Sequence, residues 1–417
     1  MITEILATGD EIRTGALVDT NSGYIAEKLE EAGIAVARHS CVGDDRDALI
    51  SIFREMGGRA DAVVATGGLG PTTDDLTAEA AAAAAGVDLE ENARALAGVE
   101  AFFAARGRPV TASNRKQAFL PRGADMLDNP VGTAPGFAMQ IGRCTFFFLP
   151  GVPPEMRRML ENHVLPRLRR LQGDVRQHCM VKTITTFGLT ESVAGEKVAA
   201  VTREFPRVKL GLRARFPEIH VKLYLNGTDQ PAMERLLDAA VSWTTAQLGK
   251  SVLSTEGASM PAVVGGLLRS QRATLAVAES CTGGRIANWL TDVSGSSDYF
   301  LLSAVTYANA MKTDLLGVSP RTLELHGAVH EETAREMAAG ARRIAGADYA
   351  IATTGIAGPS GGSAEKPVGT VCIGLATPDK ALGRRYCFPF NHRGMNKSMF
   401  AMTALNLLRR ALTPEGN

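Results

Sequence analysis

A serine that follows a short apolar segment is the first candidate for chemistry in this chain. The apolar run 273–278 predicts a buried strand ending near Ser280, and the pair Gly283-Gly284 precedes a segment with helical spacing. This order places a hydroxyl at a sheet edge, beside the first backbone N–H groups of a helix, which can hold an anion or a developing oxyanion. The simpler interpretation is a strand-to-helix turn in which Ser280 or Thr282 caps the helix.

A serine hydroxyl needs a base to become a nucleophile. None of the three histidines of the last third, His326, His330 and His392, lies in a glycine-rich loop at a strand end. His326 and His330 have the surroundings of turn and helix-start residues. Lys312 is the better candidate, because burial lowers the pKa of a lysine and makes a neutral amine available to serine. Tyr307, at the end of the same predicted strand, could relay a proton or orient Lys312. The alternative for Lys312 is a solvated helix residue.

A second glycine-rich segment, 355–362, is dense enough to hold a phosphate with backbone N–H groups. Cys281 is the rival nucleophile to Ser280, since thiols are intrinsically more nucleophilic and a helix N-terminus lowers their pKa.

The first third of the chain carries a candidate site of different chemistry. A glycine loop with Gly67, Gly68 and Gly70 follows a predicted strand, and Asp74 and Asp75 come next. The loop has neither dinucleotide-binding nor P-loop spacing, but it offers a phosphate close backbone approach and N–H groups. The two carboxylates suit a divalent cation, although they could simply cap the following helix. Other acidic residues lie in loops that could share this sheet edge: Asp10, Glu11, Asp19, Asp44 and Asp45.

Composition narrows the class of protein. The 417 residues contain 45 Lys+Arg and 44 Asp+Glu, a net charge of +1, which argues against a dedicated nucleic-acid or membrane-surface protein. No apolar run approaches the roughly 20 residues of a membrane span, and the N-terminus does not read as a secretion signal. We therefore expect a cytoplasmic protein. The six cysteines form no CxxC pair, so neither a zinc site nor a disulfide framework is expected.

The elements that must position these residues alternate between strand and helix in both the first and the last third. This alternation predicts the α/β class, with two doubly wound domains whose ligand sites lie beyond the carboxyl ends of parallel strands. The segment between them has strands and helices but no glycine loop or acidic pair, and is expected to be a small α+β connecting domain. The predicted boundaries are 1–170, 171–254 and 255–417.

The first third resembles the N-terminal half of the CinA family, which is related to molybdopterin-binding domains of the MoaB/MogA type. The matching motifs are residues 9–12, 19–21, 67–77, 114–118, 129–136 and 149–156. The resemblance implies an ADP-ribose pyrophosphatase that uses a divalent metal, magnesium or cobalt, with potassium as a further candidate ion. Asp75 and Asp44 are then the catalytic carboxylates. The predicted ligand-binding residues are Gly67, Gly68, Gly70 and Asp74, and the predicted metal ligands are Asp10, Glu11 and Asp74.

The segment 171–254 resembles the KH-like middle domain of full-length CinA proteins. It lacks the GxxG loop of nucleic-acid-binding KH modules, so RNA binding is not expected. We expect it to act as a spacer and to make contacts between domains or subunits, in a protein that forms a homodimer.

The last third resembles the nicotinamide mononucleotide deamidase domain of the PncC type. The matching motifs are residues 278–284, 295–297, 306–312, 326–329, 354–362 and 365–371. The resemblance implies hydrolysis of nicotinamide mononucleotide to nicotinate mononucleotide and ammonia, with no cofactor. By position, Ser280 is the nucleophile, Lys312 the base, Tyr307 a supporting residue and Arg393 a further catalytic residue. The predicted substrate-binding residues are Thr282, Gly283, Gly284, Asn309, Gly355, Gly358, Gly361 and Gly362.

The chain departs from this family pattern at two places. Where the family reads Tyr-Ser-Asn-Glu-Ala-Lys, residues 307–312 lack the Ser and the Glu but keep the lysine. Where the family reads Phe-x-Gly-Asp-Arg, residues 388–393 lack the Gly-Asp, and Arg393 matches the family arginine if one residue is inserted before it. The altered segment is Phe390-Asn391-His392.

Three functions are compatible with these motifs. The first is a bifunctional pyridine-nucleotide recycling enzyme that acts on nicotinamide mononucleotide and on ADP-ribose. The second is a non-catalytic nucleotide-binding protein associated with competence or DNA damage. The third, which rests on fold analogy alone, is a molybdopterin-binding domain fused to an amidase.

Overall fold

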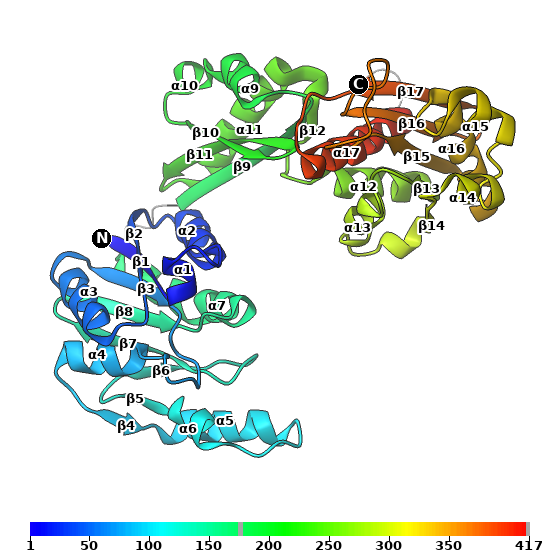
Figure 1. The fold of residues 1–417 in the computed structure, drawn as a ribbon. Coiled ribbons are helices and arrows are strands. Elements are labelled where there is room, and N and C mark those ends of the chain that lie inside the picture. Colours follow the sequence, from blue (N-terminus) through cyan, green and yellow to red (C-terminus); the bar gives the residue numbers. More distant parts are fainter. Residues whose placement is uncertain (174–177, 414–417) are drawn as a thin grey trace. The chain divides into compact units, whose positions relative to one another are not determined.

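The computed structural model describes residues 1–173 and 178–413 (Figure 1). The chain forms two compact units, one of residues 1–181 with 225–235 and one of residues 182–224 with 236 onward. The predicted α/β class is confirmed, but both large sheets are mixed rather than wholly parallel.

The sheet of the first unit has six strands in the order β2-β1-β3-β8-β7-β6. Strands β2, β1, β3 and β8 are parallel, whereas β7 and β6 are antiparallel to their neighbours. β7 and β8 pair in this way because only Gly142 and Arg143 connect them, which is too short for a crossover. The strands are β1 Thr3–Thr8, β2 Val36–Val42, β3 Ala62–Thr66, β6 Asp125–Leu127, β7 Gly136–Ile141 and β8 Cys144–Leu149. A separate pair is formed by β4 Leu89–Glu91 and β5 Phe119–Pro121.

Helices cover both faces of this sheet, because alternate strand residues belong to different cores. Val63 packs with residues of α3 and α4, whereas Val64, the next residue, packs with residues of α2, α7 and α8. Asp19 and Asp45 begin α2 and α3 by accepting the N–H groups of Ser22 at 2.9 Å and Ala48 at 2.8 Å. The helices are α1 Asp10–Arg13, α2 Thr20–Glu31, α3 Arg46–Arg59, α4 Thr77–Ala85, α5 Ala93–Ala104, α6 Ala112–Lys116, α7 Pro153–Met159 and α8 Leu165–Leu171, with a π-helical turn at Leu160–Val164.

The segment that follows folds around a four-stranded sheet in the order β10-β11-β9-β12. A tight turn at Phe216 and Pro217 joins the antiparallel strands β10 and β11. The elements are β9 His178–Phe187, α9 Glu191–Val198, α10 Val201–Glu204, β10 Lys209–Arg215, β11 Glu218–Gly227, α11 Gln230–Leu248 and β12 Val252–Ser254.

The second large sheet has five strands in the order β14-β13-β15-β16-β17. β13 is parallel to β14 and β15, whereas β16 and β17 are antiparallel to their neighbours. The strands are β13 Leu275–Glu279, β14 Phe300–Val305, β15 Tyr349–Gly355, β16 Thr370–Ala376 and β17 Ala381–Cys387. The helices are α12 Met260–Gln271, α13 Arg285–Thr291, α14 Asn309–Asp314, α15 Pro320–His326, α16 Glu331–Ala345 and α17 Arg393–Leu412.

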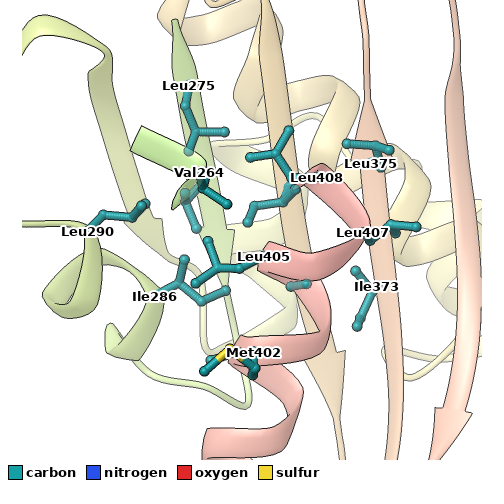
Figure 2. Packing of buried hydrophobic residues seen from close by; sticks show 14 of the residues in the cluster. Val264, Leu275, Ile286, Leu290, Ile373, Leu375, Met402, Leu405, Leu407 and Leu408 are labelled. Atoms are coloured by element: carbon teal, nitrogen blue, oxygen red, sulfur yellow. The ribbon is translucent and has the colours of Figure 1, made fainter. Parts of the chain in front are cut away.

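The two faces of this sheet are packed differently. On one face, large residues such as Leu275 and Ile373 meet α12, α13 and α17 (Figure 2). On the other face, small residues such as Ala276 and Ala352 meet α16 through Met337 and Ala338. Throughout the described residues, no helix is long and apolar enough to cross a membrane.

Candidate functional site

The carboxyl ends of β13, β14 and β15 bring the predicted serine and lysine together. Ser280 follows β13, and its backbone N–H donates to the carbonyl of Thr353 on β15 at 2.9 Å. Lys312 lies in α14, directly after β14, and its side chain is almost completely buried at 1% exposure. The solvated alternative for Lys312 is therefore wrong.

Lys312 Nζ has three oxygen neighbours. It lies 3.3 Å from Ser280 Oγ, 2.8 Å from the carbonyl of Thr306 and 3.1 Å from that of Tyr307. Burial lowers the pKa of Lys312, which favours the neutral amine, although Cys281 acts in the opposite direction. A neutral amine can donate its two N–H groups to the carbonyls, which leaves its lone pair for the hydroxyl proton of Ser280.

The turn after β13 is fixed by a buried carboxylate rather than by Ser280 or Thr282. Glu279 is fully buried and accepts the backbone N–H groups of Ile286 at 3.2 Å and Ala287 at 3.0 Å. Two of the α13 N–H groups expected to be free for an anion are therefore occupied, and the helix cap assigned to Ser280 or Thr282 is made by Glu279. Thr282 is buried and bonds the hydroxyl of Thr353 at 2.7 Å.

The rival nucleophile Cys281 is held in an unreactive state. Its side chain is buried at 5% exposure, and burial raises its pKa to about 12. The fraction of thiolate at neutral pH is therefore very small. The geometry favours Ser280.

Arg393, the first residue of α17, joins two walls of the site. Its Nη1 donates to the carbonyl of Gly358 at 2.8 Å, and its Nη2 donates to the hydroxyl of Tyr307 at 3.2 Å. Tyr307 is 63% exposed, so this contact helps to define the position of its ring at the mouth of the site.

These residues line a cavity of about 280 Å³, close to the lower end of small-molecule sites at roughly 300 Å³. Lys312 and Arg393 are the basic side chains among its lining residues, and no acidic side chain occurs among those described there. No intramolecular partner is found within the described chain for the backbone N–H groups of Ala357, Gly358 and Gly361. This wall can therefore accept an oxyanion or a phosphate.

Of the predicted substrate-binding residues, Gly355, Gly358 and Gly361 line this cavity. The others lie outside its lining, and for them the binding role stays a prediction: Thr282, Gly283, Gly284, Asn309 and Gly362.

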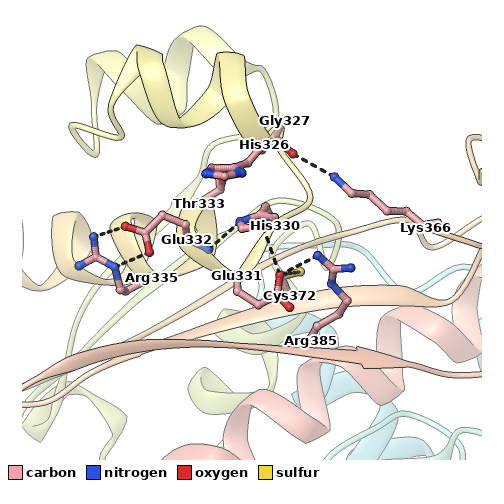
Figure 3. Close-up of polar contacts among 10 residues, drawn as sticks. All are labelled: His326, Gly327, His330, Glu331, Glu332, Thr333, Arg335, Lys366, Cys372 and Arg385. Carbon is pink, nitrogen blue, oxygen red and sulfur yellow. Dashed lines mark hydrogen bonds and ion pairs between the residues drawn. The ribbon is translucent and has the colours of Figure 1, made fainter.

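Two wall residues, Ala328 and Val329, were not predicted. They lie between His326 and His330, whose rings stack at 4.1 Å (Figure 3). The carbonyl of Ala328 accepts the Thr354 hydroxyl at 2.8 Å. The family-like motif 326–329 was the signal that could have identified this wall.

Polar contacts hold residues 326–330, here called the histidine loop, against the neighbouring elements (Figure 3). His330 caps α16, as predicted, because its Nδ1 accepts the backbone N–H of Glu332 at 3.1 Å. Lys366 Nζ donates to the carbonyl of His326 at 2.9 Å. Arg385 bonds Glu331 at 2.7 Å. Burial, followed by the neighbouring His326, lowers the pKa of His330.

The glycine loop of the first unit follows β3. Gly67 N–H donates to the carbonyl of Leu149 at 3.0 Å, and the hydroxyl of Thr77 donates to the carbonyl of Gly67 at 3.1 Å. Gly67 has a φ of 113°, and a Cβ there would collide with the backbone oxygen of Thr8. Glycine is therefore required for the loop to pass so close to the end of β1.

Most of the predicted acidic residues lie beside this loop, whereas Asp45 caps α3. Burial raises the pKa of Asp44, and the charges of Glu11, Asp10 and Asp74 raise it further, whereas the N–H of Asp10 lowers it. Asp75 accepts the backbone N–H of Thr72 at 2.8 Å and also its hydroxyl. α4 begins only at Thr77, without a side-chain cap, so the helix-capping alternative for Asp74 and Asp75 is wrong.

A cavity of about 370 Å³ lies over this loop. Its lining includes the predicted Gly67, Gly68 and Gly70. Six carboxylates line it, and no basic side chain occurs among the described residues that do so: Glu11, Asp19, Asp44, Asp74, Asp75 and Glu155. A diphosphate would be repelled here unless a cation came with it.

The donor set fits a metal that is bound together with such a ligand. Magnesium keeps several waters and takes one or two carboxylates plus substrate phosphates. Within residues 1–173 and 178–413, no cluster of three or more His, Cys, Asp or Glu side chains is preassembled for a metal ion. Asp10 bonds Arg13 at 2.9 Å and is not a lining residue, whereas Glu11 and Asp74 are.

Glu155 is a lining residue that was not predicted. Burial raises its pKa, and it accepts the side-chain amide of Asn129 at 2.6 Å. Its family-like motif, 149–156, was visible in the sequence, but nothing there showed that the carboxylate turns toward the glycine loop.

Known proteins match the chain along almost its whole length. Two family models match it, "Probable molybdopterin binding domain" at residues 4–170 and "CinA C-terminal domain" at residues 257–412. A "CinA-like protein" of Desulfosudis oleivorans is 52% identical over 412 residues, covering 99% of this chain and 100% of the relative. Another, from Geobacter metallireducens, is 43% identical and covers 99% of each chain.

Solved structures each match a part of the chain. The protein CinA of unknown function from Thermoplasma acidophilum is 38% identical, with a TM-score of 0.36, over 38% of this chain and 93% of that one. The competence damage-inducible protein A of Klebsiella pneumoniae is 33% identical, with a TM-score of 0.36, over 37% of this chain and 96% of that one. From the full-length relatives and the two family models, the chain belongs to the CinA family, with a MoaB/MogA-like N-terminal domain and a CinA C-terminal domain.

Proposed function

We propose that the C-terminal site hydrolyses the carboxamide of nicotinamide mononucleotide to the carboxylate and ammonia. The observation that carries this proposal is the buried Lys312 amine, 3.3 Å from Ser280 Oγ and anchored by two carbonyls. The anionic phosphate of this substrate suits the guanidinium of Arg393, and the described lining of the cavity contains no acidic side chain that would repel it.

The reaction proceeds through an acyl-enzyme. Ser280 Oγ attacks the carboxamide carbon while Lys312 Nζ takes the hydroxyl proton. Backbone N–H groups between Ala357 and Gly361 hold the resulting oxyanion. The carbon–nitrogen bond then breaks, and Lys312 returns the proton to the departing nitrogen, which leaves as ammonia. Water attacks the ester as Lys312 takes one of its protons, and Ser280 leaves with that proton.

Ammonia release from nicotinamide mononucleotide tests this proposal. Ser280→Ala is expected to lower kcat by at least roughly a thousandfold. Cys281→Ala is the matched neighbour and is expected to keep most of the activity, because its buried thiol takes no part. A wild-type rate no greater than that of Ser280→Ala would exclude amidase activity.

We further propose that the N-terminal site hydrolyses ADP-ribose to AMP and ribose 5-phosphate. Support comes from a glycine loop beside six carboxylates, a combination that suits a diphosphate brought in with a divalent cation. The cation would neutralise phosphate charge and lower the pKa of a bound water. Glu11, Asp44 and Asp74 would hold it, Gly67 to Gly70 would bind phosphate oxygens, and Asp75 would orient the water.

AMP formation from ADP-ribose, measured with magnesium, with cobalt and with a chelator, tests this second activity. Asp75→Asn is expected to lower it by about a hundredfold or more, with Asp88→Asn, an exposed carboxylate outside the cavity lining, as the control. Unchanged activity in Asp75→Asn would remove this residue from the mechanism. Tight binding of ADP-ribose without AMP formation would favour the non-catalytic alternative.

A further inference from the structure

The segment that precedes Arg393 is the part of the amidase site where the chain departs from its family. Arg393 is exposed, and its guanidinium is held by the carbonyl of Gly358 and the hydroxyl of Tyr307. The second of these anchors belongs to the exposed side chain of Tyr307, and Arg393 is the first residue of α17, so the residues before it also set its position. The position of Arg393 therefore depends on how residues 388–392 are held.

A buried asparagine ties this segment to the glycine loop. Asn396 is fully buried, and its Nδ2 donates to the carbonyl of Phe390 at 2.8 Å and to that of Ala357 at 3.1 Å. His392 begins the helix, since its Nδ1 accepts the N–H of Met395 at 3.2 Å. Any displacement of Phe390 is thus passed on to the first turn of α17, where Arg393 lies.

The ring of Phe390 is supported from outside the five-stranded sheet. It packs edge-on against Phe216, with ring centroids 5.4 Å apart and an interplanar angle of 85°. Phe216 lies in the turn between β10 and β11. Two residues later, Glu218 is buried and accepts the backbone N–H of Met260 at the start of α12 at 2.8 Å. The β10–β11 turn is therefore attached at two points to the part of the chain that carries the proposed amidase site, through Phe216 to Phe390 and through Glu218 to Met260.

We propose that Phe216 is a positioning residue for the amidase site, which acts through Phe390 and Asn396 on Arg393. The β10–β11 turn supplies the support for the arginine segment. This inference rests on the proposed amidase function for its kinetic consequence, but not for its structural one.

Kinetics of nicotinamide mononucleotide hydrolysis by the full chain provide the first test. If Arg393 binds the substrate phosphate equally in the ground and transition states, Phe216→Ala raises KM roughly two- to tenfold and leaves kcat nearly unchanged. Phe390→Ala has the same effect, and the double variant is no worse than either single one. Phe216→Tyr, which keeps the ring, restores the wild-type KM. Val193→Ala, a surface change in α9, is the control. Additive effects of Phe216→Ala and Phe390→Ala overturn the proposal, and an unchanged KM in Phe216→Ala overturns its kinetic part.

Hydrogen exchange of the backbone provides a test that needs no activity. Phe216→Ala is expected to speed exchange in residues 388–396 of the full chain, whereas Val193→Ala and Phe216→Tyr leave it as in the wild type. Faster exchange in a chain without amidase activity would refute the proposed function and uphold the positioning role. Unchanged exchange in Phe216→Ala would refute the positioning role, whatever the activity.

Discussion

Lys312 owes its chemistry to its surroundings rather than to its residue type. A lysine with an ordinary pKa of 10.5 is protonated at neutral pH and cannot accept the proton of Ser280. Burial in α14 lowers this pKa, and the carbonyls of Thr306 and Tyr307 fix the direction in which the amine points. The same burial keeps Cys281 protonated, so one environment activates the base and silences the neighbouring thiol.

The pH dependence of the amidase follows from this environment. Because the neutral amine is the active form, kcat is expected to rise with pH through the lowered pKa of Lys312 and to level off above it. Lys312→Arg, which keeps the charge but does not lose its proton, is expected to abolish the rise and to lower kcat about a hundredfold or more. Steady-state kinetics across the pH range measure both. A flat profile for the wild type, or an active Lys312→Arg variant, would contradict the assigned base.

At this scale the sequence located the reacting groups better than their supports. Ser280, Lys312 and Tyr307 follow strands, and the ends of parallel strands meet at one edge, so their convergence was predictable. The hydrogen bonds from two α13 N–H groups to Glu279 could not be predicted, because residues 279 and 286 approach each other only through the geometry of the turn. Nor could the bond between Arg393 and Tyr307, which joins residues 86 positions apart.

At the scale of elements, the start of α16 depends on the neutral imidazole of His330. The ring of His330 is faced by His326, Glu331, Glu332, Lys366 and Arg385 (Figure 3). Its pKa is lowered from an ordinary value of 6.5, so its contribution to stability is present above that value and is lost as pH falls through the lowered pKa. Protonation also removes the Nδ1 acceptor that caps α16.

Replacing His330 by a residue that accepts a hydrogen bond but does not titrate should separate the titration of the imidazole from the capping of α16. His330→Asn is expected to keep the cap and to lose less stability than the wild type between about pH 7.5 and pH 5.5. His330→Ala, which lacks both the cap and the titrating group, is expected to lose about 1 kcal/mol relative to the wild type at the higher pH and less at the lower one. Thermal unfolding at the two pH values measures this. An equal acid loss in the wild type and in His330→Asn would show that other groups carry the acid sensitivity.

Close packing of α16 on β16 depends on the absence of a side chain at one position. A Cβ on Gly374 would collide with the backbone carbonyl of Ala334, which cannot move without displacing the helix. Gly374→Ala is therefore expected to lower the free energy of unfolding by about 1–3 kcal/mol. Gly266→Ala, in α12, is the matched control, because its Cβ meets no neighbour and is expected to stabilise by about 0.5–1 kcal/mol. Denaturant titration compares them, and equal effects would refute the packing argument.

The sheet elements were predicted in kind but not in direction. Alternating strands and helices indicated parallel sheets, and the pattern holds for β1, β3, β13 and β15. It fails at β16, which follows the long loop 356–369 and pairs antiparallel with β15. Periodicity reports burial but not strand direction, since both directions present the same alternating faces.

At the scale of the whole molecule, the two candidate sites use residues of different units. Sites that share no residues or partners usually respond independently to substitution. Asp75→Asn is therefore expected to leave ammonia release within about twofold of the wild type, and Ser280→Ala to leave AMP formation similarly unchanged. Parallel assays of both variants test this. A cross effect larger than about tenfold would show that the two sites are coupled.

The cavity with six carboxylates has a thermodynamic consequence for the unit that contains it. Like charges held together favour any state that separates them, including the unfolded one, whereas a cation that binds only the folded state favours folding by mass action. Divalent cations alone are expected to stabilise the first unit by about 2.7 kcal/mol when the free cation concentration is a hundred times Kd. The unfolding temperature of this unit should rise accordingly, and a chelator should reverse the rise. Scanning calorimetry without nucleotide measures it, with sodium chloride of equal ionic strength as the control. If the expected shift occurs, the first unit reports the concentration of free divalent ions through its own folding equilibrium, whether or not it turns over a substrate.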